Sequence, residues 1–254
     1  MLIKSDLNCD IGCVRQNNED MILLGEELFR DKAHTLDINV TKESRFAAIV
    51  ADGMGGYNSG EIASEFGLTT FRCFVHSLPE GLSVEEITEK IKEWAQTTHR
   101  DILTKGIEGS EYKGMGTTFC GMLFYENLIL ALNIGDSRLY RFRNGILRQL
   151  SIDHSERQRT GDQSLPSNLI YNSLGAGKTT FIDVDDLTER IFDEDIFLVC
   201  SDGLCDMISD DEIEKILFTQ PTTDKLIEAA KRAGGKDNVS CILLIINKIQ
   251  YNEL

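Results

Sequence analysis

The middle of the sequence consists of short apolar runs separated by tight turns, and this pattern limits the fold more than any other feature. The runs cover residues 117–125, 128–134, 139–143 and 146–150. Glu126-Asn127 separates the first two runs and Asn144-Gly145 the last two. Asn-Gly between strand-like runs is a strong hairpin signal, because both central positions of the two-residue turn require positive φ. The region therefore predicts consecutive antiparallel strands rather than strand–helix–strand units.

Patterns of helical spacing occur in pairs on either side of this strand region. The predicted helices cover residues 59–77, 84–103, 210–217 and 223–233. Ser83 and Glu86 match a capping box at the start of the second helix. Further buried-type strands are expected at residues 46–51, 196–200 and 239–246. Hairpin-linked strands and paired helices together predict an α+β fold, with two antiparallel sheets back to back and a helix pair outside each.

A polar, irregular stretch from about His154 to Asp186 interrupts these elements. A connection of this length inside a compact domain is usually functional or mobile. The chain has only three prolines, and we find no internal repeat or low-complexity tract that would mark a linker. Residues 1–254 are therefore expected to form one domain that carries residues 154–186 as an irregular segment.

The composition limits the classes of partner that the protein is expected to bind and the cellular compartments in which it is expected. Forty-two acidic residues against 26 basic ones give a net charge of −16, which repels phosphate backbones, so nucleic acid is not expected as a partner. No apolar stretch reaches the roughly 18 residues that a membrane span needs. The seven cysteines form no C-x-x-C pair and no signal peptide is visible, which favours a reduced, cytoplasmic protein.

Acidic residues stand where several of the apolar runs stop. These residues are Asp20, Asp52, Asp136, Asp202 and Asp237. Strand ends are rigid enough to hold metal ligands, and carboxylates brought close together repel one another unless a cation lies between them. Mg²⁺ and Mn²⁺ prefer such oxygen ligands. Each aspartate taken singly is typical of a turn, but five at the ends of apolar runs favour a divalent metal site.

Arg15 allows two interpretations. An arginine at this position can form a surface salt bridge, which is the commoner role for an exposed guanidinium. It can also act as a bidentate clamp on two phosphate oxygens, because the planar guanidinium matches their spacing. The spacing of residues leaves both interpretations open.

Six motifs in order resemble those of the metal-dependent type 2C serine/threonine phosphatases. They are Arg15-x-x-Asn18-Glu19-Asp20, Val50-Ala51-Asp52-Gly53-Met54-Gly55-Gly56, Gly116-Thr117-Thr118, Gly135-Asp136-Ser137-Arg138, Ser201-Asp202-Gly203-Leu204 and Gly235-x-Asp237-Asn238-Val239-Ser240. They extend over nearly the whole chain. The resemblance implies a four-layer α-β-β-α sandwich with a binuclear Mn²⁺ or Mg²⁺ centre at one end.

The resemblance also assigns metal ligands by position. It implies that Asp52 bridges two metal ions and that the carbonyl of Gly53 holds one of them. Asp202 and Asp237 match the residues that hold the first ion.

Four further residues take their expected roles from the same resemblance. Glu19 and Asp20 match residues that act mainly through bound waters. Asp136, together with Asp202, matches a third-metal site of bacterial members. Arg15 matches the arginine that binds the phosphate of the substrate.

The sequence departs from the animal-type pattern at Met54. Animal members carry histidine there, a candidate general acid, and methionine cannot donate a proton. The Met54 form resembles bacterial members. None of the four histidines lies in a matched motif, and a surface role is expected for His154. The segment from about His154 to Asp186 matches the flap, which varies among members and is thought to affect substrate choice.

The implied reaction is hydrolysis of phosphoserine or phosphothreonine in proteins by a water that bridges two metal ions. Phosphorylated proteins are the implied partners, in signalling that opposes a serine/threonine kinase, and a monomer is expected. Two alternatives stay open. One is a pseudophosphatase that binds phosphoproteins without turnover, which would be expected to lack metal ligands. The other is a metal phosphoesterase that acts on small phosphorylated metabolites.

Overall fold

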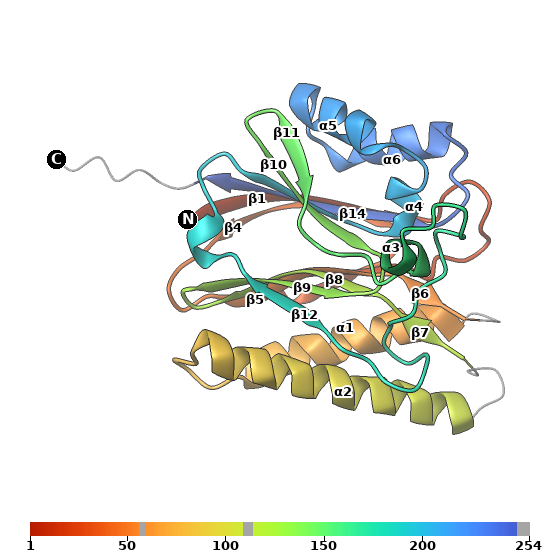
Figure 1. Ribbon diagram of the computed structural model, residues 1–254. Coiled ribbons are helices and arrows are strands. Elements are labelled where there is room, and N and C mark those ends of the chain that lie inside the picture. Colours follow the sequence, from red (N-terminus) through yellow and green to blue (C-terminus); the bar gives the residue numbers. More distant parts are fainter. Residues whose placement is uncertain (56–58, 109–113, 248–254) are drawn as a thin grey trace.

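Two six-stranded antiparallel sheets lie face to face at the centre of the molecule, and helices cover their outer faces (Figure 1). The structure is a computed structural model that describes residues 1–55, 59–108 and 114–247. One sheet contains, in spatial order, β11 (Ile146–Gln149), β10 (Arg138–Arg143), β13 (Ile196–Cys200), β14 (Val239–Asn247), β1 (Leu2–Asp10) and β4 (Lys32–Asn39). The other contains β12 (Asp183–Asp186), β9 (Leu128–Ile134), β8 (Phe119–Tyr125), β5 (Arg45–Ala51), β2 (Met21–Leu24) and β3 (Glu27–Phe29).

The helices are divided between the two sheets. Those over the sheet that contains β8 are α1 (Ser59–Ser77) and α2 (Val84–Glu108). Those over the sheet that contains β14 are α4 (Asp202–Cys205), α5 (Asp210–Thr219) and α6 (Thr223–Arg232). The shorter elements are α3 (Glu156–Thr160), the 3₁₀ turn η2 (Thr188–Arg190) and the two-stranded pair of β6 (Gly53–Met54) with β7 (Gly116–Thr117). The predicted four-layer α+β sandwich is thereby confirmed.

Local signals in the sequence have the expected geometry. Asn144 and Gly145 have φ of 52° and 80°, as a type I′ turn between β10 and β11 requires. The Ser83 hydroxyl accepts from Glu86 N at 3.2 Å, and Ser83 N donates to the Glu86 carboxylate at 2.9 Å. These paired bonds cap α2 at its first turn, where backbone N–H groups have no partner within the helix.

The strands before Arg45 were not predicted. In β1, Ile3, Leu7 and Cys9 point into the core, but Ser5 occupies one of the inward positions and obscures the alternation. An edge strand such as β4 is mostly exposed on both faces, so its sequence carries little hydrophobic pattern. β1 is held in place by pairing with β14, which lies far away in the sequence, and β2 by pairing with β5.

Among the residues that the structure describes, no helix combines the length and apolar character that a membrane crossing requires. The core occupies three layers, one between the sheets and one under each helix group. The ends of β5, β9 and β13 and the start of β14 lie at the same end of the sandwich, on the right in Figure 1.

An aromatic cluster fastens α1 and α2 to their sheet. Phe71 of α1 is fully buried, with its ring centroid 4.7 Å from that of Trp94 and 4.8 Å from that of Phe119, both near edge-on. Edge-to-face contacts of this kind add to the free energy that burial of the rings contributes. The cluster therefore ties both helices to β8.

We expect Phe71→Ala to lower the free energy of unfolding by about 3–5 kcal/mol, because it removes a buried ring and leaves a cavity. Urea unfolding followed by circular dichroism measures the change. Phe218→Ala provides the control, since Phe218 is 72% exposed, and it should change stability by less than about 0.5 kcal/mol. Equal effects of the two substitutions would contradict the role given to the cluster.

Candidate active site

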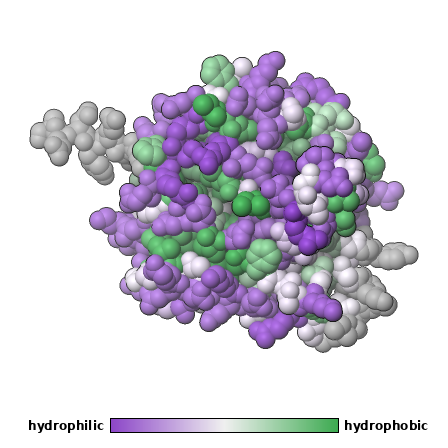
Figure 2. Space-filling view, in the orientation of Figure 1, coloured by the Kyte–Doolittle hydropathy of each residue, from purple (hydrophilic) through white to green (hydrophobic). Residues whose placement is uncertain are grey.

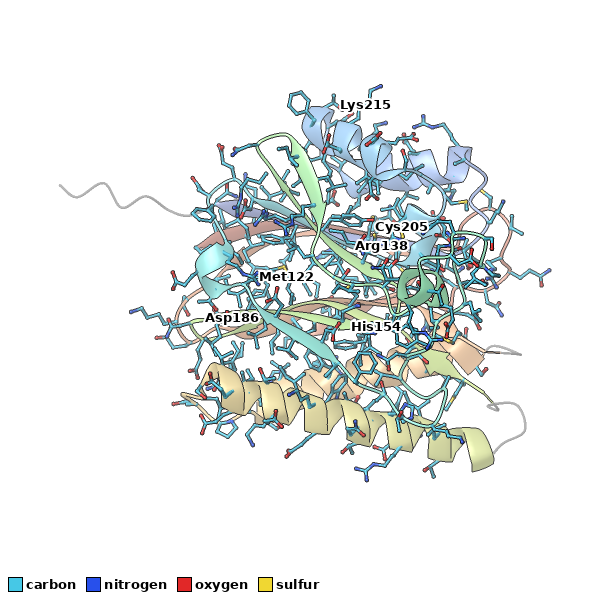
Figure 3. All side chains as sticks on the ribbon, viewed as in Figure 1. Met122, Arg138, His154, Asp186, Cys205 and Lys215 are labelled. Atoms are coloured by element: carbon cyan, nitrogen blue, oxygen red, sulfur yellow. The ribbon has the colours of Figure 1, made fainter. Side chains whose placement is uncertain are left out.

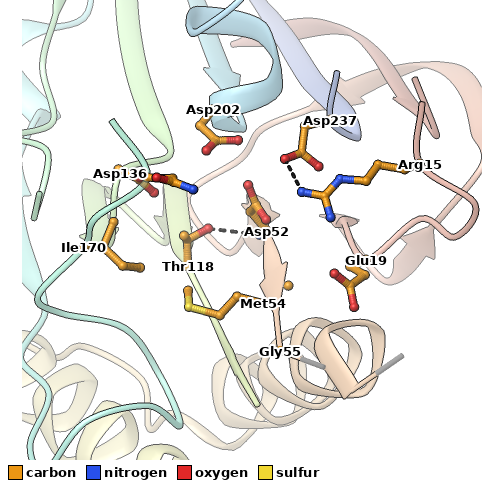
Figure 4. A pocket seen from close by; sticks show the side chains of 12 residues that line it. Arg15, Glu19, Asp52, Met54, Gly55, Thr118, Asp136, Ile170, Asp202 and Asp237 are labelled. Atoms are coloured by element: carbon orange, nitrogen blue, oxygen red, sulfur yellow. Dashed lines mark hydrogen bonds and ion pairs between the residues drawn. The ribbon is translucent and has the colours of Figure 1, made fainter. Parts of the chain in front are cut away.

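An acidic pocket of about 230 Å³ lies at the end of the sandwich where the strand ends gather. It is lined by Arg15, Glu19, Asp52, Gly53, Met54, Gly55, Thr118, Asp136, Asn168, Ile170, Asp202 and Asp237. Figure 4 shows the carboxylates of Asp52, Asp136, Asp202 and Asp237 grouped around the centre of the pocket, with Glu19 farther along its rim. All but one of the sequence-predicted site residues therefore meet here; Asp20 is the exception.

The carboxylates of this pocket repel one another. Burial raises the pKa of Asp52 well above its usual range, and the neighbouring charges of Asp20, Asp202 and Asp136 raise it further. Burial also raises the pKa of Asp202 to about 6, with further contributions from Asp237 and Asp206. The shifts mean that the pocket holds more negative charge than its own donors neutralise.

Asp136 shows the same effect. Burial is the main cause that raises the pKa of Asp136 well above the usual range, followed by the charges of Asp202 and Asp153. Burial likewise raises the pKa of Glu19. A cation among these side chains would remove both the repulsion and the cost of burial.

Asp20 lies behind the pocket rather than on its wall. Its side chain is only 1% exposed and accepts a hydrogen bond from the Ser201 hydroxyl at 2.8 Å. Burial raises the pKa of Asp20 to about 7, and the charges of Asp202 and Asp237 contribute to the shift. Asp20 therefore influences the pocket through its charge and through Ser201, the residue next to Asp202.

Arg15 forms an ion pair with Asp237 across the mouth of the pocket. Its Nη2 lies 2.6 Å from Asp237 Oδ2, and this hydrogen bond raises the pKa of Arg15. The two side chains are 49% and 36% exposed, so the pair remains in contact with water. The salt bridge that the sequence allowed for Arg15 is therefore formed, on the wall of the acidic pocket, and the phosphate clamp stays a prediction.

Hydrogen bonds from Asn238 fix the loop that carries Arg15 and Glu19. Its side-chain amide donates to the carbonyls of Ile11 and Asn17 at 3.0 and 2.9 Å. Its Oδ1 accepts from Glu19 N at 2.9 Å. A single side chain just before β14 therefore positions both ends of the loop against the neighbouring Asp237.

Close backbone contacts around the pocket require glycine at two positions. A Cβ at Gly53 would lie 2.2 Å from the carbonyl oxygen of Gly60, in the first turn of α1. A Cβ at Gly203 would lie 1.9 Å from the carbonyl oxygen of Asn238. Both distances are below any real contact, so the glycines after Asp52 and Asp202 allow the strand ends and helix starts to meet.

Thr118 is a supporting residue to which sequence reasoning gave no role. Its hydroxyl accepts from Asp52 N at 2.9 Å, and its backbone N–H donates to the Asp52 carbonyl at 2.9 Å. The hydroxyl also lies 2.7 Å from that of Ser137, next to Asp136. The dashed line in Figure 4 marks the first of these contacts. The Gly-Thr-Thr motif includes Thr118, but the sequence could not show that Thr118 bonds to Asp52 and Ser137.

Residues 154–186 supply two further side chains, Asn168 and Ile170, to the wall of the pocket. Antiparallel bridges between Ser155 and Ile170 and between Thr117 and Leu174 fasten this segment. The sequence marked the segment as irregular and as functional or mobile, but no periodicity singled out the two residues that reach the pocket.

The expected surface role of His154 is wrong. The side chain is 2% exposed, and its Nδ1 accepts from Gly135 N at 3.1 Å while Nε2 lies 3.0 Å from the Asp183 carboxylate. The backbone N–H of His154 also donates to the Gly135 carbonyl. Since Gly135 precedes Asp136, His154 joins the start of the irregular segment to the pocket; Figure 3 shows it beside β12, below Arg138.

The donor set fits a hard divalent cation. Within the described ranges, no three Asp, Glu, His or Cys side chains form a group that could hold a metal ion by themselves. The pocket instead offers carboxylates spread around a polar space. That arrangement fits Mg²⁺ or Mn²⁺, which take one or two carboxylates and retain water ligands, better than an ion such as Zn²⁺ that is usually enclosed by protein ligands.

Comparisons with known proteins agree with this site. The sequence profile of the Protein phosphatase 2C family matches residues 25–243. The serine/threonine phosphatase stp of Listeria monocytogenes is 31% identical, with 94% of each chain covered. Protein phosphatase PhpP of Streptococcus pneumoniae is also 31% identical, over 94% of this chain and 96% of its own.

Solved structures share the fold. The serine/threonine phosphatase of S. agalactiae superimposes with a TM-score of 0.80 at 28% identity, covering 96% of this chain and 100% of its own. The catalytic domain of PstP in complex with two manganese ions gives a TM-score of 0.73 at 28% identity, covering 98% and 100%. With its profile match, its relatives and its fold in agreement, the chain belongs to the protein phosphatase 2C family.

Proposed function

We propose that the acidic pocket is the active site at which this phosphatase hydrolyses phosphoserine and phosphothreonine in proteins. One observation carries the assignment: five carboxylates and one arginine, drawn from segments far apart in the sequence, line a single pocket. The repulsion among the buried carboxylates indicates that divalent cations bind there. Family membership and the manganese complex of the related PstP support Mn²⁺ or Mg²⁺ as the metal.

The carboxylates would hold the cations. Asp52 lies at the centre of the pocket and is the candidate bridge between two ions, with the Gly53 carbonyl beside it. Asp202 and Asp237 stand across from Asp52 and would hold the first ion. Asp136 lies beside Asp202, and the two would hold a third ion. When bound, such ions polarise phosphoryl oxygens and lower the pKa of water toward neutrality.

Glu19 and Asp20 would act at longer range. Glu19 lines the rim of the pocket and can hold waters there. Asp20 is buried outside the pocket lining and orients Ser201 by accepting a hydrogen bond from its hydroxyl. We propose a positioning role for Asp20, since its carboxylate does not line the pocket.

Arg15 would bind the phosphoryl group of the substrate. Its guanidinium lies at the mouth of the pocket and is half exposed. A dianionic phosphate competes with Asp237 for this guanidinium, and two parallel N–H···O bonds favour the phosphate. Met54 cannot donate a proton to the departing alkoxide, so the leaving group must take its proton from water or another residue.

The segment that contains Asn168 and Ile170 would contact the peptide around the phosphorylated residue. Asn168 offers an amide and Ile170 an apolar surface at the edge of the pocket. Because this flap segment lines the site with side chains that are not ligands, changes there can alter substrate choice without altering the metal site. The relatives support phosphoproteins as substrates, since they are serine/threonine phosphatases.

We further propose that the enzyme opposes a serine/threonine kinase in the cytoplasm and acts as a monomer. The chemistry of the substrate supports the first part, because such kinases form the esters that the pocket would hydrolyse. Dephosphorylation of a purified, autophosphorylated kinase would test it. Light scattering during gel filtration would test the second part, and a mass of two chains would reject the monomer.

Asp52→Asn should reduce turnover of a phosphothreonine peptide by at least about a thousandfold, because it removes charge at the point where cations are held. Phosphate release is measured in EDTA and then with added Mn²⁺ or Mg²⁺; the wild type should regain activity and Asp52→Asn should not. Asp211→Asn serves as the matched control, since Asp211 is exposed on α5. Near-normal activity of Asp52→Asn at saturating Mn²⁺ would reject the central role of Asp52.

Arg15→Ala should chiefly raise KM, by about tenfold or more, since one charge-assisted contact with phosphate is lost. Steady-state kinetics with a phosphothreonine peptide separate KM from kcat. Arg148→Ala, which removes an exposed arginine on β11, should leave both unchanged. An unchanged KM in Arg15→Ala would mean that Arg15 serves only its salt bridge with Asp237.

A comparison of substrates decides between the protein phosphatase and its alternatives. We expect kcat/KM for phosphothreonine peptides to exceed that for free phosphothreonine and sugar phosphates, because the flap segment contacts residues beyond the ester. Isothermal titration calorimetry with the same phosphothreonine peptide measures binding without turnover. A folded, metal-loaded protein that binds the peptide without hydrolysing it would be a pseudophosphatase, and a preference for the free metabolite would identify a small-molecule phosphoesterase.

A further inference from the structure

A second cavity, of about 300 Å³, lies between the two sheets and shares no lining residue with the acidic pocket. Its walls come from β9, β10 and β12 and from residues 150–152, which lead into the flap segment. Figure 2 shows hydrophobic side chains in a hollow between the two layers, framed by hydrophilic ones. This volume is at the lower end of the range for ligand-binding sites.

Small side chains on β9 create the cavity. Alternate residues of a strand face the same side, so Ile129, Ala131 and Asn133 face the opposite sheet. Ala131 and Asn133 fill less space than the residues around them, and Leu139 lies on the other side of the gap. The floor is therefore apolar, with one polar side chain at its inner end.

That polar side chain has an unused acceptor. Asn133 is 3% exposed, and its Nδ2 donates to the carbonyls of Gly135 and Ile152 at 3.3 and 2.8 Å. These contacts fix the amide, since turning it over would set Oδ1 against two carbonyl oxygens. Asn133 Oδ1 has no hydrogen-bond partner among the described residues. A buried acceptor without a donor is costly, and a ligand that brings a donor would remove that cost.

The other polar groups around the cavity are acceptors as well. Asp183 and Asp185 of β12 contribute carboxylates, although Asp183 contacts His154 and Asp185 pairs with Arg190. The Ser151 hydroxyl already accepts from Leu139 N at 3.0 Å. An acceptor-rich lining fits a cation with several donors, and a guanidinium carries five donors and no acceptor. The apolar floor fits the methylene stem of such a side chain.

The edge of the sheet offers a way to present that side chain. β12 is the last strand of its sheet, and β9 is its one partner among the strands that the structure describes (Figure 1). An extended peptide can add to an edge strand through backbone hydrogen bonds, and every second side chain then points to the same face. A net charge of −16 favours a basic segment as the partner.

We propose that this cavity binds the arginine side chain of an extended peptide segment that lies alongside β12. The guanidinium meets Asn133, Asp183 and Asp185, and its stem packs against Ala131 and Leu139. This assignment does not depend on the proposed reaction. The cavity nevertheless adjoins the catalytic end, because Asn133 bonds the carbonyl of Gly135, the residue before Asp136.

The test measures binding of a capped heptapeptide of valine and threonine with one central arginine, by isothermal titration calorimetry. The same peptide with norleucine in place of arginine keeps the stem and loses the charge. We expect the norleucine peptide to bind about tenfold more weakly, the loss of one charge-assisted contact. Equal affinities of the two peptides would overturn the proposal.

Two matched variants locate the site. Ile152→Arg places a cation at the rim of the cavity, where Ile152 is 59% exposed, and should weaken the arginine peptide about tenfold. Ile146→Arg makes the same charge change on β11, where Ile146 is 66% exposed and outside the cavity lining, and should change affinity less than about twofold. Equal effects of the two variants would place the peptide elsewhere.

A third arm distinguishes the source of the guanidinium. Free n-butylguanidinium should compete with the arginine peptide for the cavity but bind more weakly, because it lacks the backbone contacts with β12. Amide signals of residues 183–186 in NMR spectra should shift with the peptide and not with n-butylguanidinium. Binding of n-butylguanidinium as tight as that of the peptide would make the cavity a small-molecule site and overturn the peptide assignment.

Discussion

Mutual repulsion among buried carboxylates at one end of the sandwich is the constraint on which the rest of the molecule depends. Several acidic side chains that burial and neighbouring charge drive toward protonation must be held close together. A fold can carry such a cluster only if other parts of the structure contribute the stability that the cluster removes. The three apolar layers serve this purpose, with β8 and β13 buried throughout and β5 buried after Arg45.

The scaffold meets the same constraint through rigidity. Asp52 is bonded through its backbone to Thr118, and Asn238 holds the loop that carries Glu19. Thr118 and Asn238 lie on other segments of the chain than Asp52 and Glu19, the acidic residues that they hold. Movement of any one acidic side chain away from the others is therefore opposed by the sheet itself, which keeps ligands in place even where charge would separate them.

The sequence predicted most of the fold and the identities of the pocket residues, for identifiable reasons. Turn chemistry at Asn144-Gly145 and the capping box at Ser83 are local, so their geometry followed from neighbouring residues. The resemblance to the phosphatase family supplied the proposed ligand roles. Spacing alone could not show that Asp52 and Asp237 meet, because their contact depends on strand pairing over long sequence distances.

What the sequence missed was likewise non-local. The alternation of β1 is interrupted by Ser5, and the strand is specified by its partners β4 and β14. His154 lies in a polar segment, yet its ring is buried because Gly135 and Asp183 both bond to it. Asn168 and Ile170 reach the pocket only because the flap segment is fastened at Ser155 and Leu174. In each case the deciding partner is distant in sequence.

The position of β14 has a consequence for the order in which the protein can form. All nine residues of β1 pair with β14, which also pairs with β13, so the last strand of the described chain closes the middle of its sheet. Asp237 and Asn238 immediately precede that strand. During synthesis, one side of β1 can pair with β4 early, but its other side must wait for β14, and the acidic cluster is assembled only when the sheet is completed. Such non-local pairing slows folding, and it also delays assembly of the acidic pocket until the scaffold that holds it is in place.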